Sequence, residues 1–326
     1  DRRGTPEEFT QMSSKKGFRR FWTDGLKQGV KKYLAAKEHV EACLNDGARR
    51  LYARFTTSFA LWRRAVGCVA ELDCLLSLAT VSAGPGMCRP AFVRSATPFL
   101  RIELGINICV AASLATDCIP NDIAIGADPE GAADSAQPGG GTPPMLLVTG
   151  PNMGGKSTLL RQACLTALMA HLGCWTPAAA VRLSPVDRIF TRVGANDAIM
   201  AGLSTFRVEL EETSAILKHS TSRSIVILDE LGRGTATFDG MAIAHSVLSH
   251  LIHKTGCLSL FATHYHALTR QFEVPNPHVG LYHMACVVDE ASRAVTFLYR
   301  FAEGACNKSH GVNVARLAGL PESLLA

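Results

Sequence analysis

Apolar residues recur at helical spacing over residues 21–80, where they fall three or four positions apart. No proline interrupts this stretch, although Gly25, Gly29 and Gly47 weaken it. The pattern predicts two or three long amphipathic helices. We expect them to end at Ala83-Gly-Pro-Gly86, because glycine and proline terminate helices.

The pattern changes in the middle of the chain. Residues 89–125 are typical of short strands and turns. Residues 127–144 are rich in Gly, Pro, Ala and Asp, and include Pro138-Gly-Gly-Gly-Thr-Pro-Pro144. That composition cannot bury enough apolar surface to fold, so we expect a flexible insert there.

From residue 145 onward, short apolar runs alternate with helical patterns. Strands are predicted at residues 145–149, 224–228 and 257–262, and helices at residues 156–172 and near residues 241–254. This order predicts an α/β fold, in which a mostly parallel sheet is covered by helices on both faces.

Length and composition limit the possible classes of protein. The chain has 326 residues, enough for two domains or for one large domain with an extension, and 47% of them are hydrophobic. Because no uninterrupted run of eighteen apolar residues occurs, we expect no membrane span. The first residues, Asp-Arg-Arg-Gly, show neither a Met nor a signal-peptide pattern, so we expect a fragment of a longer protein.

Charge is unevenly distributed along the chain. The net charge is +5, made up of +8 in residues 1–64 and −3 in the remainder. A basic N-terminal part favours proximity to nucleic acid, although the solvated faces of long helices explain it equally well.

The 11 cysteines are scattered singly, and no Cys-x-x-Cys pair occurs, so zinc sites and thioredoxin-type chemistry find no support. An odd count, mostly inside apolar stretches, suits buried thiols in a reducing compartment. We therefore expect the cytosol or the nucleus.

One motif indicates phosphate binding. Gly150-Pro-Asn-Met-Gly-Gly-Lys-Ser157 fits the pattern G-x-x-x-x-G-K-[ST] between a predicted strand and a predicted helix. Glycines let several backbone N–H groups converge on one anion, at the positive end of the helix dipole. Lys156 adds a mobile charge for the terminal phosphates, and Ser157 offers a hydroxyl to magnesium. The alternative is an ordinary glycine-rich turn. The expected nucleotide contacts are Gly150, Pro151, Asn152, Met153, Gly154, Gly155, Lys156, Ser157 and Thr158.

Three further residues follow predicted strands. Asp229 and Glu230 end the second strand, where Asp229 suits the magnesium shell and Glu230 can polarise an attacking water. As an alternative, the pair caps the next helix. His264 follows the third strand, where it can donate a hydrogen bond to the γ-phosphate, although a lone histidine is more often structural.

Taken together, these motifs resemble the MutS family of DNA mismatch repair proteins, with a dense match over residues 145–320. The Asn-Met inside the phosphate loop and the Asp-Glu-x-Gly-Arg-Gly-Thr run are the specific features. The resembling stretches are Thr149-Gly-Pro-Asn-Met-Gly-Gly-Lys-Ser-Thr158, Phe190-Thr-Arg-Val-Gly-Ala195, Ser204-Thr-Phe206 with Glu209 to Thr213, Asp229-Glu-Leu-Gly-Arg-Gly-Thr-Ala-Thr-Phe-Asp-Gly240 and Phe261-Ala-Thr-His-Tyr265.

Other stretches resemble the branch of that family that supplies the large subunit of the eukaryotic mismatch-recognition heterodimer. The resemblance implies a helical lever in residues 1–83 and, in residues 84–326, a P-loop ATPase domain of the ATP-binding-cassette type. These stretches are Lys15-Lys-Gly-Phe-Arg-Arg-Phe-Trp-Thr23, Gly86-Met-Cys-Arg-Pro90, Ile119-Pro-Asn-Asp122 and Phe297-Leu-Tyr-Arg-Phe-Ala-Glu-Gly-Ala-Cys306.

The family's site residues carry over onto matching positions. By resemblance, Ser157 and Asp229 would hold Mg²⁺, Lys156 would bind the phosphates of ATP or ADP, Glu230 would activate water, and His264 would be the γ-phosphate switch. Ser204 would complete the ATP site of the partner subunit in trans, although a serine there is also an ordinary helix N-cap. Tyr299 would stack on the nucleotide base, with Ile119 beside it.

The sequence departs from the family pattern in three places. Cys118 stands where many relatives have Phe in the loop that flanks adenine, so one stacking face for the base is lost. Leu104-Gly-Ile-Asn-Ile108 lacks the usual Arg-His-Pro, and Ser309-His-Gly311 replaces Ser-Tyr-Gly. The mismatch-reading Phe-x-Glu wedge is also missing, since Phe301-Ala-Glu303 lies in the wrong region.

The resemblance implies a nuclear ATPase whose ATP cycle switches a dimeric clamp on mismatched DNA, with a second MutS homologue as partner. The alternative is a nucleotide-gated clamp of the meiotic MutS type, which acts on recombination junctions without recognising mismatches. A chromosome-cohesion ATPase with long coiled coils ranks last, because residues 21–80 lack sustained heptads.

Overall fold

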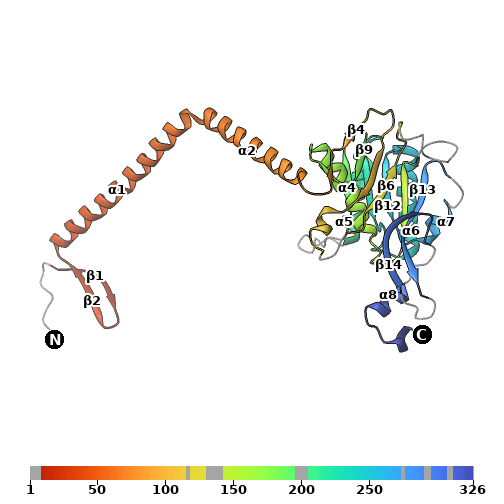
Figure 1. Cartoon of the computed structure of the whole chain (residues 1–326). Helices are drawn as coiled ribbons and strands as arrows, with labels where there is room; N and C mark the ends of the chain where they lie inside the picture. Colours follow the sequence, from red (N-terminus) through yellow and green to blue (C-terminus); the bar gives the residue numbers. More distant parts are fainter. Residues whose placement is uncertain are drawn as a thin grey trace. The chain divides into compact units, whose positions relative to one another are not determined.

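The computed structural model describes residues 9–114, 118–129, 142–194, 205–272, 276–289, 295–306 and 311–325. The chain divides into two compact units, Asp1–Leu75 and Leu76–Ala326 (Figure 1). The expected flexible insert at residues 127–144 lies mostly outside the described residues.

The first unit begins with a hairpin. Strands β1 (Thr10–Lys15) and β2 (Phe18–Trp22) pair antiparallel, and Gly17 turns the chain between them with φ at 100°. The sequence analysis missed this hairpin, because β1 is polar on both faces and gives no alternation of apolar residues.

Two long helices follow, which confirms the helical pattern over residues 21–80. Helix α1 spans Asp24–Thr57, and the side chain of Thr23 caps it by accepting a hydrogen bond from the Leu26 amide. Helix α2 spans Phe59–Ser82 and ends directly before the predicted stop. Neither helix has a buried residue in this chain.

Helix α2 bears on the expected absence of a membrane span, which stays a prediction. By length and composition it is a candidate to cross a membrane, with a window of mean hydropathy 1.6. Charged residues break the apolar run, which is why a search for an uninterrupted stretch did not find it. Two of them, Glu71 and Asp73, lie within the helix.

The second unit is built around a six-stranded sheet with the order β10-β11-β12-β7-β13-β14. The first five strands run parallel, and β14 pairs antiparallel with β13. The predicted mostly parallel sheet is therefore confirmed. Its strands are β7 (Met145–Thr149), β10 (Ile189–Arg192), β11 (Ile225–Asp229), β12 (Leu258–Ala262), β13 (Val279–Val288) and β14 (Val295–Glu303).

Both faces of this sheet are buried, because successive side chains of a strand point to opposite faces. In β7, Leu146 and Val148 join one hydrophobic cluster, while Met145 and Leu147 join the other. Helix α4 (Lys156–His171) contributes to the first cluster, and α5 (Thr205–His219) and α6 (Thr237–His250) contribute to the second. Double-sided burial explains the nearly continuous apolar runs of the central strands.

Helices α4 and α6 occupy the predicted regions. Helix α6 continues into one π-helical turn, η3 (Leu251–Thr255), and a short helix α7 (His266–Arg270) follows β12. Two short helices, α8 (Gly311–Leu317) and α9 (Glu322–Leu325), end the described chain.

A second sheet, with the order β4-β9-β5-β6, packs against the first cluster. The strands expected in residues 89–125 are present, but they accept a strand from far along the chain, β9. A short helix, α3 (Ile108–Ala111), was not expected. The strands are β4 (Ala91–Phe92), β5 (Leu100–Gly105), β6 (Asn121–Ile125) and β9 (Ala180–Leu183), and β3 (Met87–Cys88) pairs separately with β8 (Thr176–Pro177).

All eleven cysteines are free thiols. The expectation that most of them are buried is wrong, since only Cys174 and Cys257 are buried in this chain. The apolar stretches that carry several of the others lie on α1 and α2, whose surfaces are exposed.

Candidate functional site

The loop of residues 150–157 joins β7 to α4 and has a backbone that only glycine adopts easily. Gly150 has φ at 132°, and Gly155 caps α4 with φ at 96°. A Cβ on Gly150 would lie 3.2 Å from the main chain of Met284 on β13. The glycines therefore allow the loop to curl tightly against the sheet and direct its amides toward one point.

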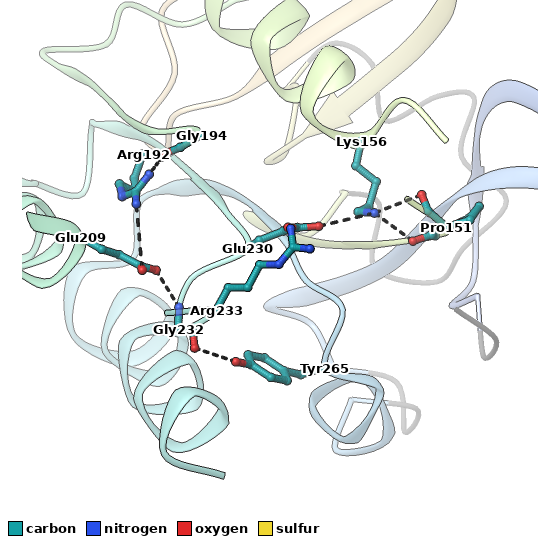
Figure 2. A network of polar contacts seen from close by, with 10 residues as sticks. Pro151, Lys156, Arg192, Gly194, Glu209, Glu230, Gly232, Arg233 and Tyr265 are labelled. Atoms are coloured by element: carbon teal, nitrogen blue, oxygen red, sulfur yellow. Dashed lines mark hydrogen bonds and ion pairs between the residues drawn. The ribbon is translucent and has the colours of Figure 1, made fainter. Parts of the chain in front are cut away.

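Lys156 is the first residue of α4, and it is 5% exposed. Its Nζ donates hydrogen bonds to the carbonyl oxygens of Gly150 at 2.9 Å and Pro151 at 3.2 Å (Figure 2). Nζ also lies 3.9 Å from Oε1 of Glu230. Burial lowers the pKa of Lys156, and the Glu230 carboxylate opposes that shift. The loop thus curls around the ammonium group of its own Lys156, at the N-terminal, positive end of α4.

Asp229 ends β11 and faces Ser157 of the loop. Burial raises the pKa of Asp229, and a hydrogen bond from the Ser157 hydroxyl counteracts this shift. Oδ1 of Asp229 is buried and has no hydrogen-bond partner among the described residues. A hydroxyl and a carboxylate with an orphaned oxygen form the oxygen donor set that magnesium prefers, so these residues fit that ion. No cluster of three His, Cys, Asp or Glu within the described residues offers another metal site.

Glu230 follows in the left-handed backbone region, with φ at 52°. Its amide donates to the carbonyl of Ala262 on β12. The carboxylate is largely buried and accepts a hydrogen bond from Nη1 of Arg233 at 2.5 Å. A non-glycine residue there costs about 1–2 kcal/mol, so the surrounding contacts must hold the strain. Such strain is typical of a functional site.

His264 lies two residues beyond the end of β12. Burial lowers the pKa of His264, against the opposing charge of Glu230. Its imidazole is therefore neutral at neutral pH, and its buried Nδ1 has no partner among the described residues. A neutral ring with an unpaired nitrogen is suited to exchange a hydrogen bond with a bound group.

A cavity of about 710 Å³ opens beside the loop. Among the predicted contacts, those that line it are Ile119, Pro151, Asn152, Met153, Gly155, Lys156, Ser157, Thr158, Glu230 and Tyr299. Four other predicted residues lie beside this set. Gly150, Gly154 and Asp229 each adjoin a lining residue in the sequence. His264 interacts electrostatically with two lining residues, Glu230 and Lys156. Cys118, the departure noted in the sequence, also lines the cavity. Ser204 lies outside the described residues, and α5 begins at the next position.

Sequence reasoning missed other lining residues, above all Met284 and Phe297. Phe297 lies two positions before Tyr299 on β14, with their rings 6.1 Å apart, so alternation along a strand was the available signal. Met284 comes from β13 and gives no such signal.

Asn121 was also missed as a site residue. It is 9% exposed and connects the two sides of the cavity's apolar end. Its Nδ2 donates to the carbonyls of Tyr299 at 2.9 Å and Ile119 at 3.3 Å. Its Oδ1 accepts from the Phe301 amide at 2.7 Å. Asn121 therefore holds Tyr299, whose φ is 51°, against the Ile119 loop.

Comparisons with known proteins show the family of this chain. Residues 146–326 match the model of MutS domain V. The chain is 48% identical to DNA mismatch repair protein Msh6 of Gallus gallus, over 99% of this chain and 24% of that protein. It is 46% identical to Msh6 of Homo sapiens, with the same coverage. It is 41% identical to MSH3 of Phaeosphaeria nodorum, over 98% of this chain and 27% of that protein. The chain spans about a quarter of the length of these relatives.

Proposed function

The chain belongs to the MutS family of DNA mismatch repair proteins, and we propose that it is the ATP-binding and ATP-hydrolysing module of such a protein. One observation carries the proposal. The phosphate loop, the carboxylates of Asp229 and Glu230, and His264 follow β7, β11 and β12, which are neighbours in the sheet. Parallel strands end at the same edge, so these groups converge there.

We propose that the second unit is a P-loop ATPase of the ATP-binding-cassette type, and that residues 1–83 form its helical lever. The strand, glycine loop and helix at residues 145–171 support the first part. The two long helices α1 and α2 support the second.

ATP or ADP with magnesium is the proposed ligand. The cavity volume of about 710 Å³ lies in the range of small-molecule sites. Its apolar end, between Ile119 and Tyr299, would take the base, and the loop amides with Lys156 would bind the phosphates. Ser157 and Asp229 would hold Mg²⁺, which when bound neutralises charge on the phosphate oxygens.

Hydrolysis would use the carboxylate of Glu230, whose backbone is strained. Glu230, fixed by its backbone bond to Ala262 and by Arg233, would take a proton from the attacking water. His264 is neutral, so it would donate a hydrogen bond to the γ-phosphate without adding charge. Burial of Lys156 concentrates its charge on the phosphates, because water screens it little.

We propose a second MutS homologue as partner, with Ser204 completing the partner's ATP site in trans. The basic residues 1–64 would contact DNA backbone, and the ATP cycle would switch the dimeric clamp on mismatched DNA in the nucleus. We propose that the apolar surface of α2 packs on protein rather than lipid. Glu71 and Asp73 lie near the helix centre, where a bilayer disfavours charge.

The relatives found carry the names Msh6 and MSH3, DNA mismatch repair proteins. They do not favour the alternative of a meiotic-type clamp that acts on recombination junctions.

A nucleotide-binding measurement tests the proposal. Lys156→Ala should weaken binding of ATP and magnesium by about 100-fold, since hydrogen bonds to charged groups contribute about 1.5–3 kcal/mol each. The matched control is Lys218→Ala, which removes an exposed lysine on α5 and should leave affinity unchanged. Isothermal titration of the two variants gives the comparison. Equal affinities in both would refute the assignment of residues 150–157 as the phosphate site.

A further inference from the structure

A buried set of polar contacts surrounds the main chain of Gly232, two residues beyond Glu230 (Figure 2). The Gly232 amide donates to Oε1 of Glu209 at 2.7 Å, and both groups are buried. The Gly232 carbonyl accepts from the hydroxyl of Tyr265 at 2.8 Å, which is also buried. The side chains of Glu209 and Tyr265, which are far apart in the sequence, therefore bind the amide and the carbonyl of this glycine.

The backbone around Gly232 leaves no room for movement. Gly232 has φ at 88°, and a Cβ added to it would lie 2.5 Å from the carbonyl oxygen of Gly240 on α6. This turn immediately follows the strained Glu230. A displacement of Gly232 would therefore be transmitted to Glu230 and Arg233 through a short, tightly packed backbone.

Glu209 lies in α5, and it is 5% exposed. Its Oε2 lies 4.0 Å from Nη2 of Arg192, a buried residue at the end of β10. Nε of the same arginine lies 2.9 Å from Oε2 of Glu212, about one turn beyond Glu209 on the same helix. A buried carboxylate needs such partners, because an unpaired charge costs several kcal/mol. The Glu209 carboxylate thus lies between the Gly232 amide on one oxygen and the Arg192 guanidinium on the other.

The start of α5 also contacts the same loop at a second point. A Cβ added to Gly234 would lie 3.0 Å from Cβ of Phe206, so the first turn of α5 packs directly on it. Helix α5 begins at Thr205, the residue after Ser204 in the sequence. The loop that carries Glu230 and the helix assigned to the partner's site are therefore joined by two contacts.

Tyr265 connects the other side of the glycine to His264, the residue proposed to contact the γ-phosphate. It follows His264 directly, and their rings lie 4.2 Å apart. Burial and the Glu209 charge both raise the pKa of the Tyr265 hydroxyl, so it stays protonated and remains a donor. A shift of His264 against a phosphate would change the geometry at Gly232.

We propose that Glu209 and Tyr265 are positioning residues that hold the Gly232 peptide between them and couple this chain's ATP site to helix α5. Neither residue is among those that line the cavity beside the phosphate loop. Their effect passes through the backbone to Glu230, and through α5 toward the partner's site. This inference rests on the proposed function, which assigns hydrolysis to Glu230.

The experiment measures hydrolysis site by site in the full-length protein assembled with its partner, with one site inactivated at a time. Tyr265→Phe removes only the hydroxyl, and we expect kcat to fall about tenfold at both sites while KM changes less than twofold. Glu209→Ala should have a similar effect. Glu209→Gln keeps an oxygen for the Gly232 amide, so it should restore most of the activity that Glu209→Ala loses.

The control is Thr213→Val, one turn further along α5. Thr213 is buried and its hydroxyl donates only to the main chain of Glu209, so kcat should stay within twofold of wild type. The double variant Glu209→Ala with Tyr265→Phe should be no slower than the slower single variant, because both act through one peptide.

A merely structural role predicts another result. It would lower the unfolding temperature and the fraction of active protein, and the effects of the two substitutions would multiply. Wild-type kcat at either site in Tyr265→Phe would overturn the proposed coupling. Lys156→Ala separates this from failure of the proposed function: if that variant hydrolyses ATP normally, the function itself is wrong.

Discussion

Asn121 offers the sharpest test of the cavity's apolar end. Asn121→Ala would leave the Tyr299 carbonyl and the Phe301 amide without their partners. A buried polar group without a partner costs about 1–3 kcal/mol. Because β14 is an edge strand that water can reach, we take about 1 kcal/mol for each of the two groups. Together the two unpaired groups destabilise the conformation that holds Tyr299 by about 2 kcal/mol, relative to conformations in which Tyr299 is released.

Release of Tyr299 is also favoured by its own backbone, since φ at 51° is strained for a side chain with a Cβ. About 2 kcal/mol corresponds to roughly a 30-fold change in the population that binds the base. We expect the Kd for ATP to rise about 10- to 30-fold. The kcat at saturating ATP should change less than twofold, because Lys156 and Glu230 keep their contacts.

Titration of a fluorescent ATP analogue, followed by steady-state hydrolysis, measures both quantities. The control is Asp122→Asn, an exposed neighbour whose Oδ1 accepts a hydrogen bond from the Leu104 amide rather than from the strand that carries Tyr299. Its Kd should equal that of wild type. An unchanged Kd in Asn121→Ala, or a normal Kd with a reduced kcat, would refute the positioning role.

Three other predictions follow from the site. Glu230→Gln should keep ATP binding and slow single-turnover hydrolysis by roughly 10²–10⁴-fold, the range for a positioned base; a wild-type rate would move the base elsewhere. Ser204→Ala should leave this chain's own ATP affinity unchanged and slow hydrolysis at the partner's site, measured with the other site inactivated; a loss in this chain's own site would show that Ser204 acts in cis. Because the pKa of His264 is lowered in the folded state, the unfolded state binds the extra proton first as pH falls below about 6.5. Urea unfolding between pH 7 and pH 5 should therefore show a smaller loss of stability in His264→Gln than in wild type, and equal losses would contradict the burial of a neutral ring.

Much of the fold could be predicted because its signals are local. The phosphate loop lies between a strand and a helix whose apolar patterns are unambiguous, and the structure has β7 and α4 at those positions. The long helices ended at the predicted glycines and proline. The expectation of no membrane span stays a prediction, since α2 has the length and composition of a candidate span although charged residues interrupt its apolar run.

The site was only partly predictable. The glycines, Lys156, Asp229 and Glu230 belong to runs whose spacing carries their chemistry. Asn121 and Glu209 lie in stretches that resemble the family, but the sequence assigned neither of them a role, because an Asn or a Glu by itself is ordinary in a sequence. Their importance comes from which main-chain groups they reach.

The sequence by itself therefore determined the long helices, the central strands with their parallel character and the residues expected at the strand ends. Periodicity and turn residues depend on neighbours within a few positions, so a linear chain records them. Only the tertiary structure decided that β9 joins β5, that Asn121 meets Tyr299 and that Glu209 reaches Gly232. These contacts join residues from 23 to 178 positions apart. They arise because buried polar groups must find partners in three dimensions, and one sequence does not state which distant group will be near.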